Sequence, residues 1–84
     1  MDIKIRTKTK VSLIDCTRKS LGLYGKSING ELDCIAATSG ERIEILGKYE
    51  NEARAQEVLD QIQEIIEIGL KGKKDGIIIQ MPEN

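Results

Sequence analysis

Three patterns in the sequence predict a small α+β domain. Apolar and charged residues alternate over 3–6 and again over 41–46, which is typical of half-buried strands. From Ala55 onward the apolar residues recur at steps of three and four, the spacing of a helix that buries one face. A short apolar run, 77–79, comes after this segment. We expect an antiparallel sheet of about five strands in a meander, one C-terminal amphipathic helix packed on it, and a short final strand over 77–81.

Turn residues divide the first half of the chain into strands. A polar turn at 7–10 separates the first two strands, which predicts a hairpin. Gly22 and Gly25 weaken the third strand and indicate a bulge or a close backbone approach. Asn29-Gly30 is the strongest turn signal, because both central residues of a type I′ turn need positive φ. The strands expected in this half span 3–6, 11–16, 21–28, 31–38 and 41–46.

The helix has a clear start and end in the sequence. Asn51 is a good N-cap, because its side-chain oxygen can accept hydrogen bonds from the free amides of the first turn. Glu52 favours the positive end of the helix dipole, and Gly69 and Gly72 mark the C-terminus. The stripe expected to face the sheet consists of Ala55, Val58, Leu59, Ile62, Ile66 and Leu70.

Size and composition predict one domain, residues 1–84, with a thin margin of stability. A chain this short hides only about 60 to 65% of the surface that its unfolded form exposes. It has no Phe or Trp, two Tyr and fourteen Ile, so its core is aliphatic and benefits from a partner surface. The first expected strand begins at residue 3, so we expect no leader, and no apolar run approaches the roughly 20 residues of a membrane span. We therefore expect a cytoplasmic protein without a membrane anchor.

The two cysteines do not indicate a metal or cofactor. Cys16 and Cys34 lie eighteen positions apart, and the chain has no His and no Cys-x-x-Cys pair, so the spacing of zinc ligands is absent. One disulfide between them stays open, although a buried free thiol is the more common state of cysteine in a cytosolic protein. We expect no metal and no cofactor.

Catalytic signals are weak. Without His, acid–base catalysis would fall to carboxylates, Lys, Tyr or Cys, and the acids gather on the expected outer face of the helix, where no pocket raises their pKa. Cys16 lacks a neighbouring base that would lower its pKa, and only Arg18 and Lys19 are near it in sequence. The glycines match neither a dinucleotide-binding nor a P-loop pattern. We predict that the protein is not an enzyme.

Charge is unevenly distributed along the chain. Residues 1–30 carry a net charge of +5, residues 31–70 carry −7 and residues 71–84 carry +1. Such cations can contact phosphates, or they can simply keep a sheet edge soluble. The sequence pI of about 5.4 and the single nearby aromatic residue, Tyr24, argue against general nucleic-acid affinity. The candidate basic patch consists of Lys4, Arg6, Lys8, Lys10, Arg18 and Lys19.

Apolar residues outside the helical stripe predict a homodimer. On a helical wheel Ile65 lies at the edge of the stripe, and Ile68 lies toward the charged face. Residues 77–79 do not alternate, which predicts a strand buried on both faces. A second copy could cover both features, either through a two-fold contact that uses the same patch on each chain or by exchange of the C-terminal strand. The expected contact residues are Ile65, Ile68, Ile77 and Ile79.

Five short segments carry a resemblance to a known group of proteins. They are Ile5-Arg6-Thr7, Leu13-Ile14-Asp15-Cys16, Leu46-Gly47-Lys48-Tyr49, the run from Ala55 to Ile62, and Gln80-Met81-Pro82. In these segments the chain resembles a family of small uncharacterised proteins encoded by Gram-positive bacteria, their phages and prophages. Residues 17–40 lie outside the resemblance. The family brings no catalytic activity with it, and a phage setting implies a small binder, such as an inhibitor of a host enzyme or a protein that sequesters a host ligand.

The leading functional interpretation is therefore a non-catalytic protein-interaction or ligand-sequestering module, a phage or prophage accessory factor that also binds itself. Its further partner is an unknown protein or small molecule. The alternative is a nucleic-acid or anionic-ligand binder that uses the candidate basic patch.

Overall fold

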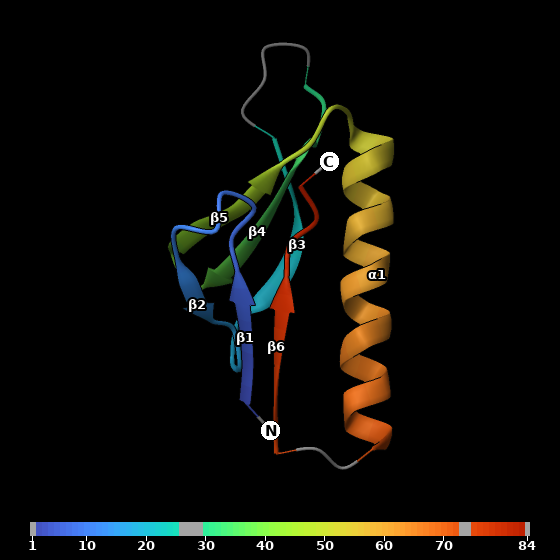
Figure 1. Cartoon of the computed structure of the whole chain (residues 1–84). Helices are drawn as coiled ribbons and strands as arrows, with labels where there is room; N and C mark the ends of the chain where they lie inside the picture. Colours follow the sequence, from blue (N-terminus) through green and yellow to red (C-terminus); the bar gives the residue numbers. More distant parts are fainter. Residues whose placement is uncertain (1, 26–29, 73–74, 84) are drawn as a thin grey trace.

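The computed structural model describes residues 2–25, 30–72 and 75–83, and the predicted α+β class is confirmed (Figure 1). The described residues form six strands and one helix. In chain order these are β1 (Asp2–Arg6), β2 (Leu13–Asp15), β3 (Ser20–Tyr24), β4 (Cys34–Ser39), β5 (Arg42–Lys48), α1 (Glu52–Lys71) and β6 (Gly76–Gln80).

The strands form two three-stranded sheets instead of the single meander that the sequence suggests. The first sheet has the order β2-β1-β6 and the second has the order β3-β4-β5. The predicted hairpin of β1 and β2 is antiparallel, and so is the whole second sheet, whereas β6 runs parallel to β1 with Ile5 opposite Ile79. Parallel neighbours need a long crossover between them. Here the crossover passes through the second sheet and α1, so the last strand returns to the first sheet.

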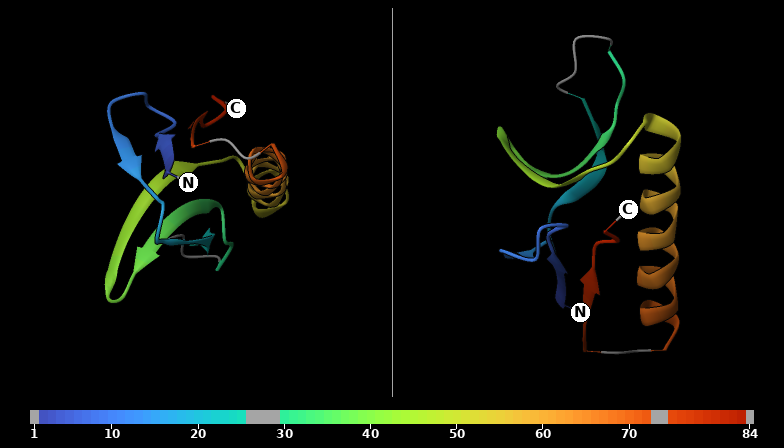
Figure 2. Two further views of the ribbon diagram at one scale, coloured as in Figure 1. Left: turned by 90° about the horizontal axis from the view of Figure 1, so that it is seen from below. Right: turned by 45° about the horizontal axis from the view of Figure 1, so that its top comes forward.

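A backbone contact joins the two sheets beyond the end of β1. The amide of Lys8 donates to the carbonyl oxygen of Leu46 in β5 over 2.8 Å. The chain after β6 follows β1 closely, because the amide of Met81 donates to the carbonyl oxygen of Arg6 over 3.1 Å. Figure 2 shows the result: the two sheets and α1 surround a common interior.

The predicted helix cap is confirmed. The side-chain oxygen of Asn51 accepts from the amide of Arg54 over 2.9 Å, and Glu52 begins the helix. At the other end the amide of Gly72 donates to the carbonyl oxygen of Ile68 over 3.0 Å. Both ends therefore satisfy backbone groups that a helix otherwise leaves free.

Most of the predicted helical stripe lies in the core, but Leu70 does not. Leu70 is 58% exposed, while Gly69 beside it is buried. The last turns of α1 extend beyond the start of β3 (Figure 1), so the flank of α1 that faces β3 has no strand of that sheet beneath it there. The buried hydrophobic cluster consists of Ile5, Cys16, Ile35, Ala37, Leu46, Tyr49, Ala55, Val58, Ile62, Ile79 and Met81, with Leu59 and Ile66 packed against it and partly buried.

The prediction that the last strand is buried on both faces is wrong. Ile79 is only 3% exposed, but Ile78 is 69% exposed and pairs in register with Lys4 on β1. Because the second sheet and α1 cover only one face of the first sheet, β6 alternates between core and surface like any half-buried strand.

The connection between β3 and β4, which contains Gly25 and Gly30, is longer than predicted. β3 ends at Tyr24 and β4 begins at Cys34, so both strands are shorter than expected. A Cβ at Gly25 would collide with the carbonyl oxygen of Glu31, which confirms a close backbone approach. Of the predicted turn, Asn29 lies outside the described residues, and Gly30 has a φ of 77°.

Candidate interaction surfaces

Lys4 and Arg6 lie exposed on the outer face of β1. Asp15 on β2 is opposite Lys4 in register. Hydrogen bonds from the side chain and amide of Thr17 hold the pKa of Asp15 below its usual value, and the charges of Lys4 and Lys19 act in the same direction. The outer face of the first sheet therefore mixes both signs of charge instead of presenting cations alone.

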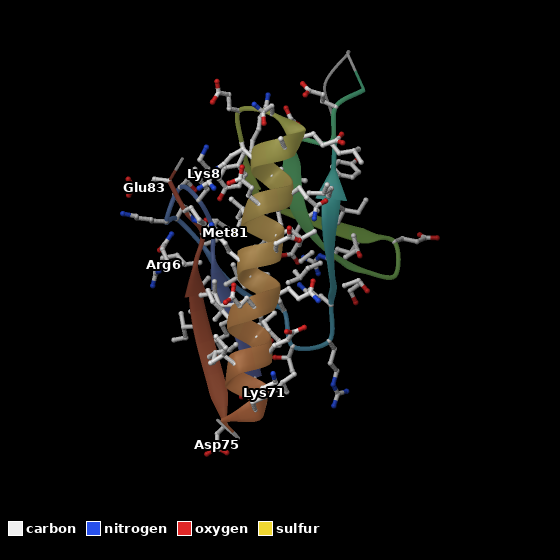
Figure 3. The ribbon with its side chains drawn as sticks, turned by 90° about the vertical axis from the view of Figure 1, so that its right-hand side faces the viewer. Arg6, Lys8, Lys71, Asp75, Met81 and Glu83 are labelled. Atoms are coloured by element: carbon white, nitrogen blue, oxygen red, sulfur yellow. The ribbon has the colours of Figure 1, made fainter. Side chains whose placement is uncertain are left out.

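Three other members of the candidate basic patch already have partners. The Lys8 ammonium donates to the carbonyl oxygen of Lys48 over 2.5 Å. Lys10 pairs with Glu83 over 2.5 Å. Lys19 pairs with Glu44 over 2.9 Å, and its hydrogen bond lowers the pKa of Glu44. Figure 3 shows Lys8 near Glu83, with Arg6 lower on the same side.

Arg18 lies exposed in the turn before β3. Lys4, Arg6 and Arg18 are thus the exposed members of the predicted set that form no ion pair among the described residues. The structure does not bring all six cations into one unpaired patch, because the loops that carry them fold back onto acids and backbone carbonyls.

Tyr49 is buried among these groups and has a structural role. Its ring centroid lies 4.7 Å from the Lys8 nitrogen and 6.0 Å from the Arg54 guanidinium carbon. Its hydroxyl donates to the carbonyl oxygen of Pro82 over 2.8 Å. Burial raises the pKa of Tyr49, so the phenol stays protonated and keeps this hydrogen bond.

Both cysteines are buried thiols that form no disulfide with each other, which is the state that the sequence favours. The Cys16 thiol lies 3.6 Å from the carbonyl oxygen of Ile14, and burial raises its pKa. A protonated thiol inside the core is a poor nucleophile. Among the described residues no three His, Cys, Asp or Glu side chains gather in a way that could hold a metal ion.

The predicted dimer contact is only partly on the surface. Ile65 is 44% exposed and Ile68 is 59% exposed, as expected. Ile77 packs partly buried against the core and Ile79 is inside it, so Ile79 is not available for a contact. Ile78 is exposed but is absent from the predicted set, because its outward position follows from its register opposite Lys4 on β1 and not from a pattern within 77–79.

Ile65 and Ile68 belong to an uncharged seam along α1. Gln61, Ile65, Ile68 and Gly72 follow one another at steps of four, three and four, which is the spacing at which one helix packs along another. The seam carries no charge, whereas several acids are exposed beside it on α1. These acids include Glu57, Asp60, Glu64 and Glu67.

A second apolar surface lies on the other flank of α1. A groove of about 300 Å³ runs between α1 and β3. Figure 3 shows α1 in front, with β6 on one side and β3 on the other. The groove is lined by Leu21, Leu59, Ile62, Gln63, Ile66 and Glu67.

Comparison with protein-family models, curated proteins and solved structures finds no match to this chain. The resemblance to small phage and prophage proteins therefore stays a prediction. Among the described residues, α1 lacks the apolar stretch that a bilayer-spanning helix requires.

Proposed function

We propose that this protein is a non-catalytic protein-interaction module that works as a homodimer. The observation that carries the proposal is the uncharged seam on α1, with Ile65 and Ile68 exposed at its centre. Ile78 is also exposed, on the face of β6 that α1 does not cover. A small aliphatic core leaves a chain of this size marginally stable, and a second copy supplies the missing apolar contact.

The seam suits a two-fold contact. In an antiparallel pair of α1 helices centred on the seam, Ile65 of one copy meets Ile68 of the other, and Gln61 meets Gly72. Each contact then occurs twice, as a two-fold axis requires. Full burial of an isoleucine side chain contributes about 1.5 to 3 kcal/mol. A contact centred on the exposed acids of α1 would instead set acids against acids, which costs free energy.

Two buried titratable side chains, Cys16 and Tyr49, support a role without catalysis. Cys16 and Tyr49 both have raised pKa values because they are buried, and each donates its hydrogen to a backbone carbonyl. Groups held protonated in the core stabilise the fold and do not attack a substrate.

Sedimentation at micromolar concentration tests the proposal. We expect a dimer for the wild-type chain, a monomer for Ile68→Lys, and a dimer for the control Asp60→Lys, which adds the same side chain about 100° round the helix from Gln61. Ile78→Lys should weaken the dimer if β6 takes part. A wild-type monomer throughout, or a dimer that survives Ile68→Lys unchanged, would refute the proposal.

A second candidate function is anion or nucleic-acid binding by Lys4, Arg6 and Arg18, which are exposed. Binding of a single-stranded oligonucleotide through three phosphates should weaken with salt at a logarithmic slope of about −2. Lys4→Glu together with Arg6→Glu should abolish it. If no oligonucleotide binds at low salt, this candidate fails and the dimer proposal is unaffected.

A further inference from the structure

We propose that the groove between β3 and α1 is a second binding site, which takes an extended peptide segment of alternating aliphatic and basic residues as an added strand on β3. This site lies on the flank of α1 opposite the dimer seam. At 100° per residue, Ile68 is about 200° round the helix from Ile66, which lines the groove. The proposal therefore does not depend on the homodimer.

β3 has an open edge for a partner strand. In the described part of the chain β3 pairs with β4 and with no other strand. In an antiparallel pair about half of the backbone N–H and C=O groups of an edge strand point away from its neighbour. Such an edge is a template for another chain, and strand addition is a common way to bind an extended peptide.

The groove beside this edge provides contacts for side chains. Leu21 on β3 and Leu59 and Ile66 on α1 are all partly buried against the core and line the groove. Successive side chains of an added strand point to opposite faces, so every second residue of the peptide would point into the groove. A volume of about 300 Å³ suits two or three aliphatic side chains.

The rim of the groove determines the charge of the partner. Glu67 lines the groove, and Asp60 lies two turns earlier on the same flank. Gln63 donates to Glu67 over 3.3 Å and Gln56 donates to Asp60 over 3.0 Å, which holds both carboxylates in place.

No cation in the described part of the chain pairs with either of these carboxylates. Lys or Arg residues at the outward positions of the peptide would complement them. The same acids argue against a second copy of β3 as the occupant, because edge-to-edge pairing would bring two acidic rims together.

A fluorescein-labelled seven-residue peptide of alternating Lys and Val is the probe, and fluorescence anisotropy measures its binding. We expect Glu67→Lys to weaken binding by about tenfold or more, which corresponds to the loss of one well-placed charge contact. Glu64→Lys, the same change on the same helix but outside the groove, should weaken it by less than about threefold. A peptide with Glu in place of Lys should bind the wild-type chain poorly and Glu67→Lys better.

Hydrogen exchange tests the strand geometry. Amides at alternate positions of β3 should exchange slowly only when the Lys-Val peptide is bound. The proposal is overturned if the peptide does not bind at about 1 mM, if Glu67→Lys and Glu64→Lys bind it equally, or if binding leaves exchange in β3 unchanged. Ile68→Lys should bind the peptide as the wild type does, so loss of the dimer and loss of peptide binding are separate results.

Discussion

The phenol of Tyr49 donates its hydrogen to the carbonyl oxygen of Pro82 over 2.8 Å. This bond connects the residue that follows β5 to the segment that follows β6, and the ammonium of Lys8 lies over the same ring. Tyr49 is only 3% exposed. One buried side chain therefore links the end of β5, the turn after β1 and the C-terminal segment.

Tyr49→Phe should destabilise the protein by about 0.5 to 2 kcal/mol, because the carbonyl of Pro82 loses its donor while the ring keeps its packing. Urea unfolding measures the change. Tyr24→Phe is the matched control, since Tyr24 is only half buried, and it should have a smaller effect. Equal effects of the two variants would contradict a structural role for the Tyr49 hydroxyl.

The free energy of unfolding should fall as the pH rises into the alkaline range. Burial raises the pKa values of Cys16 and Tyr49 in the folded state, so the unfolded chain releases these protons first as the pH rises. The contribution of each group is complete below its unfolded pKa, about 8.5 for Cys and about 10 for Tyr, and declines above it.

Urea midpoints measured from about 1.5 pH units below to about 2 units above the unfolded pKa of Cys follow this decline. Cys16→Ala should remove the part of the fall in urea midpoint that begins near the unfolded pKa of Cys. Tyr49→Phe should remove the part that begins near the unfolded pKa of Tyr. A wild-type urea midpoint that stays level or rises over this range would show that folding does not raise the pKa values of Cys16 and Tyr49.

The sequence predicts elements whose signal is local. The N-cap at Asn51 and the stripe through Ala55, Val58 and Ile62 are confirmed, because a cap and a helical period depend on neighbours in the chain. The division of the strands into two sheets is not local. It depends on β6 pairing with β1 at the opposite end of the sequence, and no pattern within either strand specifies that partner.

The candidate sites also divide into features with a local sequence signal, which can be predicted, and features that depend on distant segments, which cannot. The exposure of Ile65 and Ile68 is visible on a helical wheel, but the exposure of Ile78 depends on the register between β6 and β1. The basic patch was inferred from cations close in sequence, whereas Lys19 meets its acid, Glu44, on a different strand. The groove between β3 and α1 has no sequence signal, because its two walls come from separate segments.

Gly47→Ala should destabilise the protein by about 1 to 3 kcal/mol through overpacking. A Cβ at Gly47 would lie 2.9 Å from the Cβ of Lys8 and 3.3 Å from the ring of Tyr49. Gly22→Ala is the control, because a Cβ there meets nothing within 4 Å, and it should leave stability level or raise it slightly. Thermal unfolding compares the two, and a stable Gly47→Ala would show that the turn after β1 can move away from β5.

Truncation along α1 tests whether the helix packs as the structure places it. Ile62 is buried among residues of both sheets, so Ile62→Ala should cost about 2 to 5 kcal/mol, the sum of lost burial and a new cavity. Ile68→Ala removes the same atoms from an exposed position and should cost less than about 0.5 kcal/mol in the monomer. Loss of the dimer would add a concentration-dependent term for Ile68→Ala. Both variants are therefore compared with the wild type by urea unfolding at a concentration low enough for all three to be monomeric. If Ile62→Ala costs under about 0.5 kcal/mol, the stripe faces solvent and the packing of α1 against β3 and β6 is wrong.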